Sequence, residues 1–250
     1  MNTVLGNILK RFQTEGVSSA LRLMGARIGS LLRSAIEDRR RGVSTARELK
    51  DRALGITDLS NHWYVATDYQ TFRRAMKHVD IRPGEDVFVD IGAGMGRMVL
   101  LAAELPFRKV LGVEFSRQLT DIGRENLRAA LPGLACKDVE LILADATQWP
   151  VPHDATVLFL FNPFDGEVLA KVCANIRQSL AEAPRKLTIV YVRSEKFFEK
   201  EIAWQEWLLR THEIPCVEGR VAIYESKLLP GAVRNGRPGR AAKPEPAEIL

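Results

Sequence analysis

The chain has 250 residues, 46% of them hydrophobic, which is enough to bury one sizeable core with a small additional segment. No apolar run approaches the ~20 residues of a membrane-spanning helix, and the first residues lack the pattern of a signal peptide. The three cysteines (Cys136, Cys173 and Cys216) are far apart and form no C-x-x-C pair. This spacing predicts reduced thiols, a cytoplasmic location and no metal site.

The net charge of +5 is unevenly distributed along the chain. Residues 1–52 carry 11 Lys and Arg against 5 Asp and Glu, a balance of +6, whereas residues 53–226 have −4 and residues 227–250 have +3. Basic ends can contact nucleic acid, an acidic partner or an anionic membrane surface. Solvated helices and tails are the commoner source of such a bias, and the charge alone does not decide between these interpretations.

In chain order, the first predicted element is a basic helical extension that occupies residues 1–80. Apolar residues recur among arginines in the first 52 residues, and the polar stretch EDRRRGVSTARELKDRALG (37–55) continues in the same helical style. At the other end of the chain, residues 229–250 are rich in proline and glycine and have almost no bulky apolar residues. This composition predicts a disordered tail.

The middle of the chain, residues 81–228, alternates between strand-like and helix-like segments. The expected strands lie at 86–91, 109–114, 139–144, 156–161 and 187–192, and residues 168–180 have the spacing of one apolar helix face. A Trp-rich helical stretch (194–209) and an antiparallel hairpin (211–217 and 219–226) are expected to follow. Such alternation predicts an α/β fold with a doubly wound, mostly parallel sheet.

A glycine motif follows the first expected strand, with Gly92, Gly94 and Gly96 spaced as G-x-G-x-G. Glu114, Asp145 and the run Asn162-Pro163-Phe164 follow later strands, at the edge where ligands of open α/β sheets bind. A carboxylate such as Glu114 can accept ribose hydroxyls, and Asp145 can accept from an adenine amine. Each residue alone is also explained as a cap or turn, but together they indicate a nucleotide-like ligand.

With these motifs, residues 85–226 resemble the class I S-adenosylmethionine-dependent methyltransferases. The resemblance implies a seven-stranded sheet of order 3-2-1-4-5-7-6 and S-adenosylmethionine as cofactor. It also implies a set of cofactor-binding residues: Asp90 toward the methionine end, Gly92, Ala93, Gly94 and Gly96 under the cofactor, Glu114 at the ribose, and Asp145 with Ala146 at the adenine.

A finer resemblance is to the seven-strand protein-lysine methyltransferases of the histone-core and ATP-synthase c-subunit types, through G-x-G-R-x-x-x-x-A-A followed by G-V-E. It implies methyl transfer to a lysine-type amine of a protein, with Asn162, Pro163 and Phe164 as catalytic residues. The amino-methyltransferase pattern N-P-P-[YF] is N-P-F-D in this chain. The upstream segment 61–72 supplies three residues that either cover the methyl-donor end or simply pack on the sheet: Tyr64, Thr67 and Tyr69.

Two other functions are compatible with the same motifs. The first is methylation of a small molecule at nitrogen or oxygen, for which His153 is the candidate base for an oxygen acceptor. The second is a catalytically inactive nucleotide-binding protein on the same fold. The presence of both Glu114 and Asp145 argues against the second, because a decayed site has no need of these acids.

Overall fold

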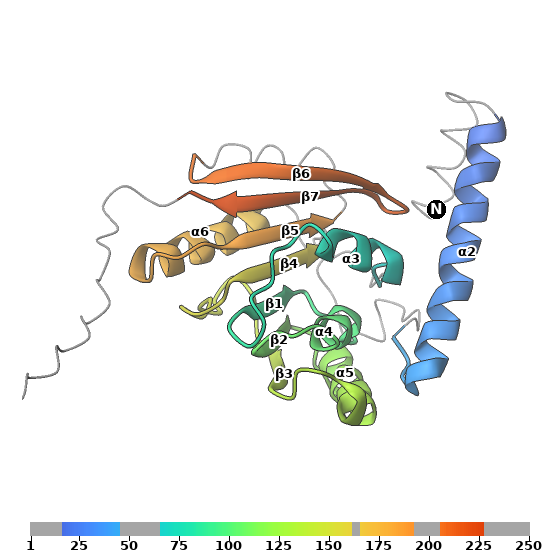
Figure 1. Ribbon diagram of the computed structural model, residues 1–250, viewed down its shortest axis with the longest axis horizontal. Helices are drawn as coiled ribbons and strands as arrows, with labels where there is room; N and C mark the ends of the chain where they lie inside the picture. Colours follow the sequence, from blue (N-terminus) through green and yellow to red (C-terminus); the bar gives the residue numbers. More distant parts are fainter. Residues whose placement is uncertain (1–16, 46–65, 162–165, 193–205, 228–250) are drawn as a thin grey trace, which may run out of the picture.

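The computed structural model describes residues 17–45, 66–161, 166–192 and 206–227 (Figure 1). Predictions that fall elsewhere, including the disordered tail and most of the Trp-rich helix, lie outside the described residues. The helices and strands are, in order, α2 (Val17–Arg41), α3 (Tyr69–Met76), β1 (Val87–Ile91), α4 (Arg97–Ala103), β2 (Lys109–Glu114), α5 (Arg117–Ala130), the 3-10 turn η2 (Leu131–Gly133), β3 (Val139–Leu143), β4 (Val157–Phe161), α6 (Gly166–Glu182), β5 (Thr188–Val192), β6 (Leu208–Cys216) and β7 (Gly219–Ser226).

The strands form one seven-stranded sheet with the order β3-β2-β1-β4-β5-β7-β6. β1 to β5 pair in parallel, whereas β7 runs antiparallel to both β5 and β6. The predicted fold and strand order are therefore confirmed, including the trailing hairpin. Because β1 lies between β2 and β4, the carboxyl ends of these three strands meet at one edge of the sheet.

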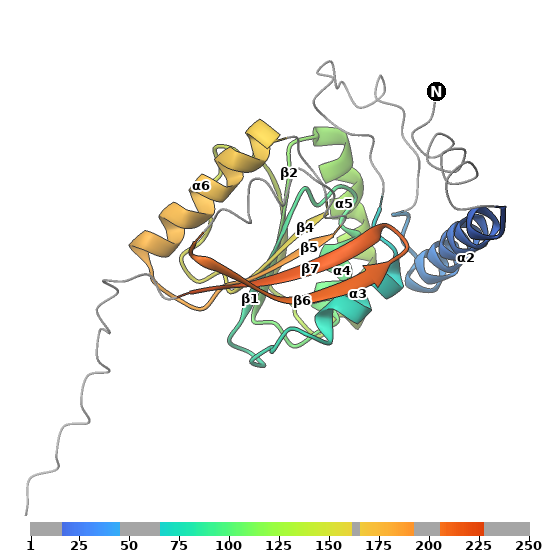
Figure 2. The ribbon, with the colours of Figure 1, turned by 90° about the horizontal axis from the view of Figure 1, so that it is seen from above.

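Helices cover both faces of the sheet, which explains why most residues of its central strands are apolar (Figure 2). β1 is buried at every position and divides its side chains between two cores. Phe88 points to the core that includes Phe72 of α3 and Val99 of α4, whereas Val89 points to the core that includes Ile176 of α6. The expected apolar face of α6 is indeed buried at Leu169, Val172, Cys173, Ile176 and Leu180.

Two predicted helical stretches contain described residues that are not helical. The helical pattern of residues 37–55 is interrupted because α2 ends at Arg41 and Gly42 has a φ of 67°, a left-handed conformation that terminates helices. Leu208 and Leu209, assigned to the Trp-rich helix, instead begin β6 and pair with Ser226 and Glu225 of β7. Pairing along the hairpin satisfies the backbone groups of this segment.

α2 lies beside the domain next to α3 and is held by a buried polar cluster, here called the α2 anchor (Figure 1). Asp38 accepts hydrogen bonds from the Tyr69 hydroxyl (2.6 Å) and from the Thr45 amide (2.6 Å) and hydroxyl (2.7 Å). Arg97, the first residue of α4, donates from Nε to Thr45 Oγ1 (2.7 Å) and from a guanidinium nitrogen to Ser34 Oγ (3.2 Å). The α2 anchor consists of Ser34, Asp38, Thr45, Tyr69 and Arg97.

Candidate cofactor site

The glycine motif forms the loop between β1 and α4, at the carboxyl edge of the sheet. Gly92, Gly94 and Gly96 have φ angles of 85°, 55° and 82°, in the left-handed region that side chains with a Cβ rarely adopt. The amides of Gly92 and Ala93 donate to the carbonyl oxygen of Val113 (2.9 and 3.0 Å), which ties the loop to the end of β2. The conformation of the loop therefore explains its glycines.

Glu114, the last residue of β2, lies against this loop. Its carboxylate accepts from the amide of Gly94 (2.9 Å) through one oxygen and from the amide of Ser116 (2.9 Å) through the other. Burial raises the pKa of Glu114, and the two amides oppose this rise. Because each carboxylate oxygen can accept a second hydrogen bond, Glu114 keeps acceptor capacity for a pair of hydroxyl groups. This geometry suits the predicted ribose contact.

Asp90 lies one residue before the end of β1, and its side chain is almost completely buried. Burial raises the pKa of Asp90 well above its usual range, and the charge of Glu114 raises it further. Within the described residues, no ion pair joins either acid to a cation. Two buried acids without a cation are costly unless a ligand compensates them. S-adenosylmethionine carries a sulfonium and an ammonium group, so the acid pair fits this cofactor.

The predicted adenine contacts, Asp145 and Ala146, follow β3. The Asp145 side chain accepts from the amide and hydroxyl of Thr147 (both 2.8 Å) and from Gln148 Nε2 (3.3 Å), so here it caps a turn. Asn175 of α6 donates to the carbonyl oxygens of Ala146 (3.1 Å) and Thr147 (2.9 Å) and holds this turn in place. The adenine role of Asp145 and Ala146 stays a prediction.

Asn126, a residue of α5, fixes the back of the glycine loop and was not predicted from the sequence. Its side-chain amide donates to the carbonyl oxygens of Met95 in the loop (3.0 Å) and of Ser44 (3.1 Å), and its oxygen accepts from the Ser44 amide (2.9 Å). The segment that follows α2 is thereby attached to the cofactor loop. No sequence pattern pointed to Asn126, because its partners are 31 and 82 residues away.

The residues considered for the donor end are distributed differently. Tyr69 is buried in the α2 anchor, so the packing alternative describes it, and the carbonyl oxygen of Thr67 accepts from Arg97 (2.9 Å). His153 precedes β4, at the amino end of the sheet, and its Nε2 lies 2.8 Å from Glu182 at the end of α6. His153 therefore does not reach the glycine loop. Tyr64 lies outside the described residues.

The three predicted catalytic residues, Asn162, Pro163 and Phe164, also lie outside the described residues. Their approach to the site is defined by β4, which ends at Phe161. Ile91 of β1 pairs with Leu160, so β4 delivers the chain to the same edge as the glycine loop, one strand away. The catalytic assignment stays a prediction.

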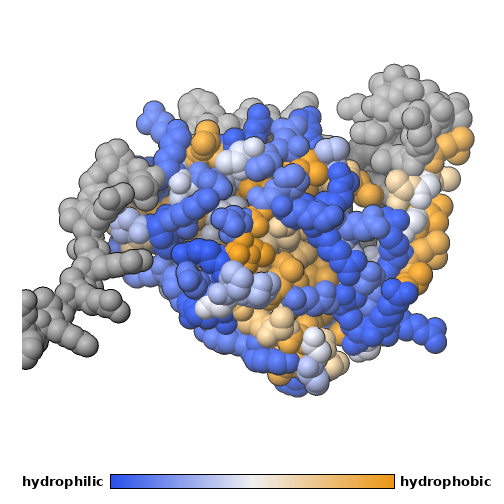
Figure 3. All heavy atoms as spheres, viewed as in Figure 1, coloured by the Kyte–Doolittle hydropathy of each residue, from blue (hydrophilic) through white to orange (hydrophobic). Residues whose placement is uncertain are grey.

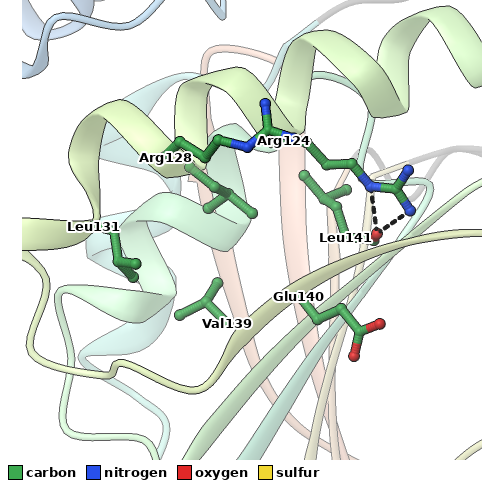
Figure 4. A pocket seen from close by; sticks show the side chains of 7 residues that line it. Arg124, Arg128, Leu131, Val139, Glu140 and Leu141 are labelled. Atoms are coloured by element: carbon green, nitrogen blue, oxygen red, sulfur yellow. Dashed lines mark hydrogen bonds between the residues drawn. The ribbon is translucent and has the colours of Figure 1, made fainter.

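A surface pocket of about 250 Å³ lies elsewhere, between α5 and the edge strand β3 (Figure 4). Arg124 reaches across it and donates to the carbonyl oxygen of Leu141 (3.1 and 2.9 Å), which covers part of an otherwise open sheet edge. None of the predicted cofactor residues lines this pocket. We therefore regard it as a feature of the sheet edge and not as the cofactor site.

Comparison with known proteins gives a family match over the part of the chain that contains this site. Residues 88–183 match the family described as "Methyltransferase domain". No curated protein matches the chain. The matched region begins in β1 and ends just after α6, so it contains the glycine loop, Glu114, Asp145 and the end of β4.

Several solved structures are similar to the chain. One is an RNA methyltransferase from Salinibacter ruber in complex with S-adenosyl-L-homocysteine (22% identity, 69% of this chain and 98% of that chain, TM-score 0.47). Another is a ribosomal protein L11 methylase from Lactobacillus delbrueckii subsp. bulgaricus (14% identity, 64% and 77%, TM-score 0.47). These two proteins are described as acting on different substrates, RNA and ribosomal protein L11, and the acceptor of this chain does not follow from them. With the sheet order and the glycine loop against Glu114, the match over residues 88–183 shows a methyltransferase domain of the class I, S-adenosylmethionine-dependent type.

Proposed function

We propose that the protein transfers a methyl group to a nitrogen, of the lysine-amine type, on a protein substrate. The observation that carries the proposal is the end of β4 beside β1, with Ile91 opposite Leu160. In the sequence, the run Asn162-Pro163-Phe164 follows that strand directly. It would supply two oxygen acceptors and an aromatic ring to the acceptor side of the site.

The cofactor would be held by the residues already described. Glu114 would accept the ribose hydroxyls, Asp90 would face the methionine end, and Asp145 with Ala146 would border the adenine. When bound, S-adenosylmethionine supplies an electrophilic methyl group on a positively charged sulfur. Support comes from two buried acids, Asp90 and Glu114, that no cation of the described residues pairs with, because a positively charged ligand would stabilise them.

The chain's own task is to orient the acceptor. A free lysine amine has a pKa of about 10.4, so the nucleophile must be deprotonated and aligned before it can react. The Asn162 side-chain oxygen and the Pro163 carbonyl oxygen would accept the amine N–H groups and direct its lone pair at the methyl carbon. Phe164 would form an aromatic wall that also attracts the cationic form of the amine.

We also propose that residues 1–80 act as a cap on the domain formed by residues 81–228. Support comes from Asn126, which connects Ser44 to the glycine loop, and from Arg97, the first residue of α4, which bonds to Ser34 of α2. Cofactor binding would then depend on how the segment after α2 is seated. The remaining residues, 229–250, form the proposed tail.

Transfer of tritium from labelled cofactor to a cell lysate tests the acceptor class. A labelled protein band whose methyl groups survive mild base, and which yields methylated lysine after hydrolysis, is the expected result. Label in the small-molecule fraction alone would support the alternative acceptor. Label released by base would indicate a carboxyl ester.

Asn162→Ala then tests the catalytic assignment on the labelled substrate. Loss of one oriented polar group should lower kcat on the order of 10²–10³ while cofactor affinity stays the same. Phe164→Leu serves as the milder comparison because it keeps the shape and removes only the aromatic face. Full kcat in Asn162→Ala would refute the role of this residue.

A further inference from the structure

The orientation of α2 is the reverse of that of an ordinary surface helix. An amphipathic helix usually buries its apolar face and exposes its polar one. α2 contacts the domain through polar side chains that recur every three or four residues. Ser30 and Arg33 bond with Asp68, and Ser34 and Asp38 belong to the α2 anchor. Farther along the helix, Glu37 pairs with Arg73 and Arg41 pairs with Glu104. These contacts occupy the polar face, so the apolar face is turned away from the domain.

The outward face of α2 carries a row of large aliphatic side chains, here called the α2 stripe. On a helical wheel of 3.6 residues per turn they fall on the side opposite the polar contacts. Figure 3 shows them as apolar surface along α2 at the right-hand edge of the molecule. The members and their exposed fractions are Leu21 (56%), Met24 (44%), Ile28 (52%), Leu31 (66%), Leu32 (61%) and Ile36 (52%).

Charge on α2 is divided between the same two faces. Its sequence contains two acidic residues, Glu37 and Asp38, and both are used in the inward contacts. Arg39 and Arg40, by contrast, are exposed at the carboxyl end of the helix, next to the α2 stripe. The outward side of α2 therefore combines aliphatic side chains with positive charge and has no acidic residue.

We propose that the α2 stripe binds the surface of an anionic lipid bilayer, with the helix lying in the plane of the interface. Aliphatic side chains would enter the boundary of the acyl chains, and the arginines would contact lipid phosphates. The whole segment 1–52 has a charge balance of +6 against −4 for residues 53–226, which orients the basic end toward an anionic surface. The proposal does not depend on the identity of the methyl acceptor.

The charge of α2 also favours an anionic bilayer over a second copy of the chain as the partner of the α2 stripe. Two α2 stripes packed together would bring the exposed arginines of both copies near one interface, with no outward acidic residue on α2 to pair with them. A bilayer containing anionic lipid offers both the apolar layer and the negative charge. Among the described residues, no helix has the length and apolar character needed to cross a bilayer, so α2 would rest on the surface.

Co-sedimentation of the full-length protein with vesicles tests the proposal. Vesicles of phosphatidylcholine mixed with phosphatidylglycerol should bind the protein, and vesicles of phosphatidylcholine alone should bind it about tenfold less. Ile28→Glu, in the centre of the α2 stripe, should reduce binding to the mixed vesicles about tenfold or more. The double variant Arg39→Gln, Arg40→Gln should reduce the preference for anionic lipid, and added salt should do the same.

Leu209→Glu is the matched control, because Leu209 is equally exposed (55%) but lies on β6. It should bind vesicles like the unmodified protein. All variants should have the melting temperature and the cofactor affinity of the unmodified protein. A misfolded variant would lose both, so these measurements distinguish lost binding from misfolding. Absence of binding to the mixed vesicles would overturn the proposal. So would a dimer in sedimentation equilibrium that Ile28→Glu dissociates, since the α2 stripe would then be a contact between copies.

Discussion

The protein buries acidic side chains in two places, and these places differ in whether described residues compensate the negative charge. In the α2 anchor, Asp38 accepts three hydrogen bonds, and the guanidinium of Arg97 lies 3.9 Å away. At the glycine loop, Asp90 and Glu114 lie together with raised pKa values and no described cation partner. A buried acid that is compensated within the chain holds structure together. One that no described cation compensates is the candidate site for a ligand that supplies the missing charge.

The largest expected effect is a loss of stability when the compensated acid of the α2 anchor, Asp38, is removed. Asp38→Ala leaves Arg97 buried without its acid and removes three hydrogen bonds, which should cost about 3–5 kcal/mol of stability. Urea denaturation followed by circular dichroism measures this loss. Asp154→Ala is the matched control: its ion pair with Arg108 is short (2.6 Å) but exposed, so its removal should cost under ~1 kcal/mol. Equal losses of stability in both variants would show that the buried α2 anchor contributes no more to the free energy of unfolding than an exposed ion pair does.

At the glycine loop, Gly94→Ala should remove cofactor binding, with a loss of about a hundredfold or more in affinity by calorimetry. Gly94 and Gly84 share a left-handed φ (55° and 70°), so alanine at either position introduces backbone strain of about 1–2 kcal/mol. A Cβ at Gly84 meets no atom within 4 Å. Gly84→Ala should therefore show the strain without the loss of affinity. If both variants bind normally, the ligand does not contact this loop.

Asp90→Asn should raise stability while it weakens cofactor binding about tenfold. Because the folded pKa of Asp90 is raised, the cofactor-free protein loses stability as pH rises above the unfolded value of about 4, through the folded pKa. The asparagine variant should lack this loss, and its melting temperature above that pH should be higher. Thermal melts across this pH range, with and without S-adenosylmethionine, measure both effects.

The control for Asp90 lies four residues earlier in the chain. Burial acts to raise the pKa of Asp86, but hydrogen bonds from Arg82 lower it below the usual range. Its contribution to stability is therefore present above the unfolded pKa and is lost as pH falls. Asp86→Asn should destabilise the protein at neutral pH and leave cofactor affinity unchanged. Identical pH profiles for the two variants would contradict the contrast between the two kinds of acid.

The smallest expected effect is at the rim of the α2 anchor. The hydrogen bond from Arg73 lowers the pKa of Glu37 to about 2, although partial burial opposes it. Glu37 should thus stabilise the docked α2 above pH ~4.5 and lose this effect as pH falls toward 2. Glu37→Gln should cost about 1 kcal/mol at neutral pH after allowance for screening, and less at high salt. Glu167→Gln, in an exposed pair with Lys171, should change nothing measurable.

Much of the fold and part of the site could be predicted from local patterns. Alternating apolar runs indicated the strands, and the resemblance supplied their order, which the structure confirms. The spacing of the glycines and the position of Glu114 at a strand end predicted the edge of the sheet at which the cofactor binds. Local patterns failed at Leu208 and Leu209, because these residues pair with β7 instead of continuing a helix. For Tyr69 the sequence left two alternatives open, and the bond to Asp38 decides for packing.

By itself, the sequence determined that this protein has a Rossmann-like sheet, a glycine loop and a basic helical segment near its start, because each depends on the spacing of neighbouring residues. Only the tertiary structure decided which way that helix faces. Arg97 and Ser34 are 63 residues apart, and Asn126 and Ser44 are 82 apart. Contacts over such separations leave no periodic pattern in the sequence. They nevertheless provide partners for the polar side chains of α2, so its apolar face is turned outward.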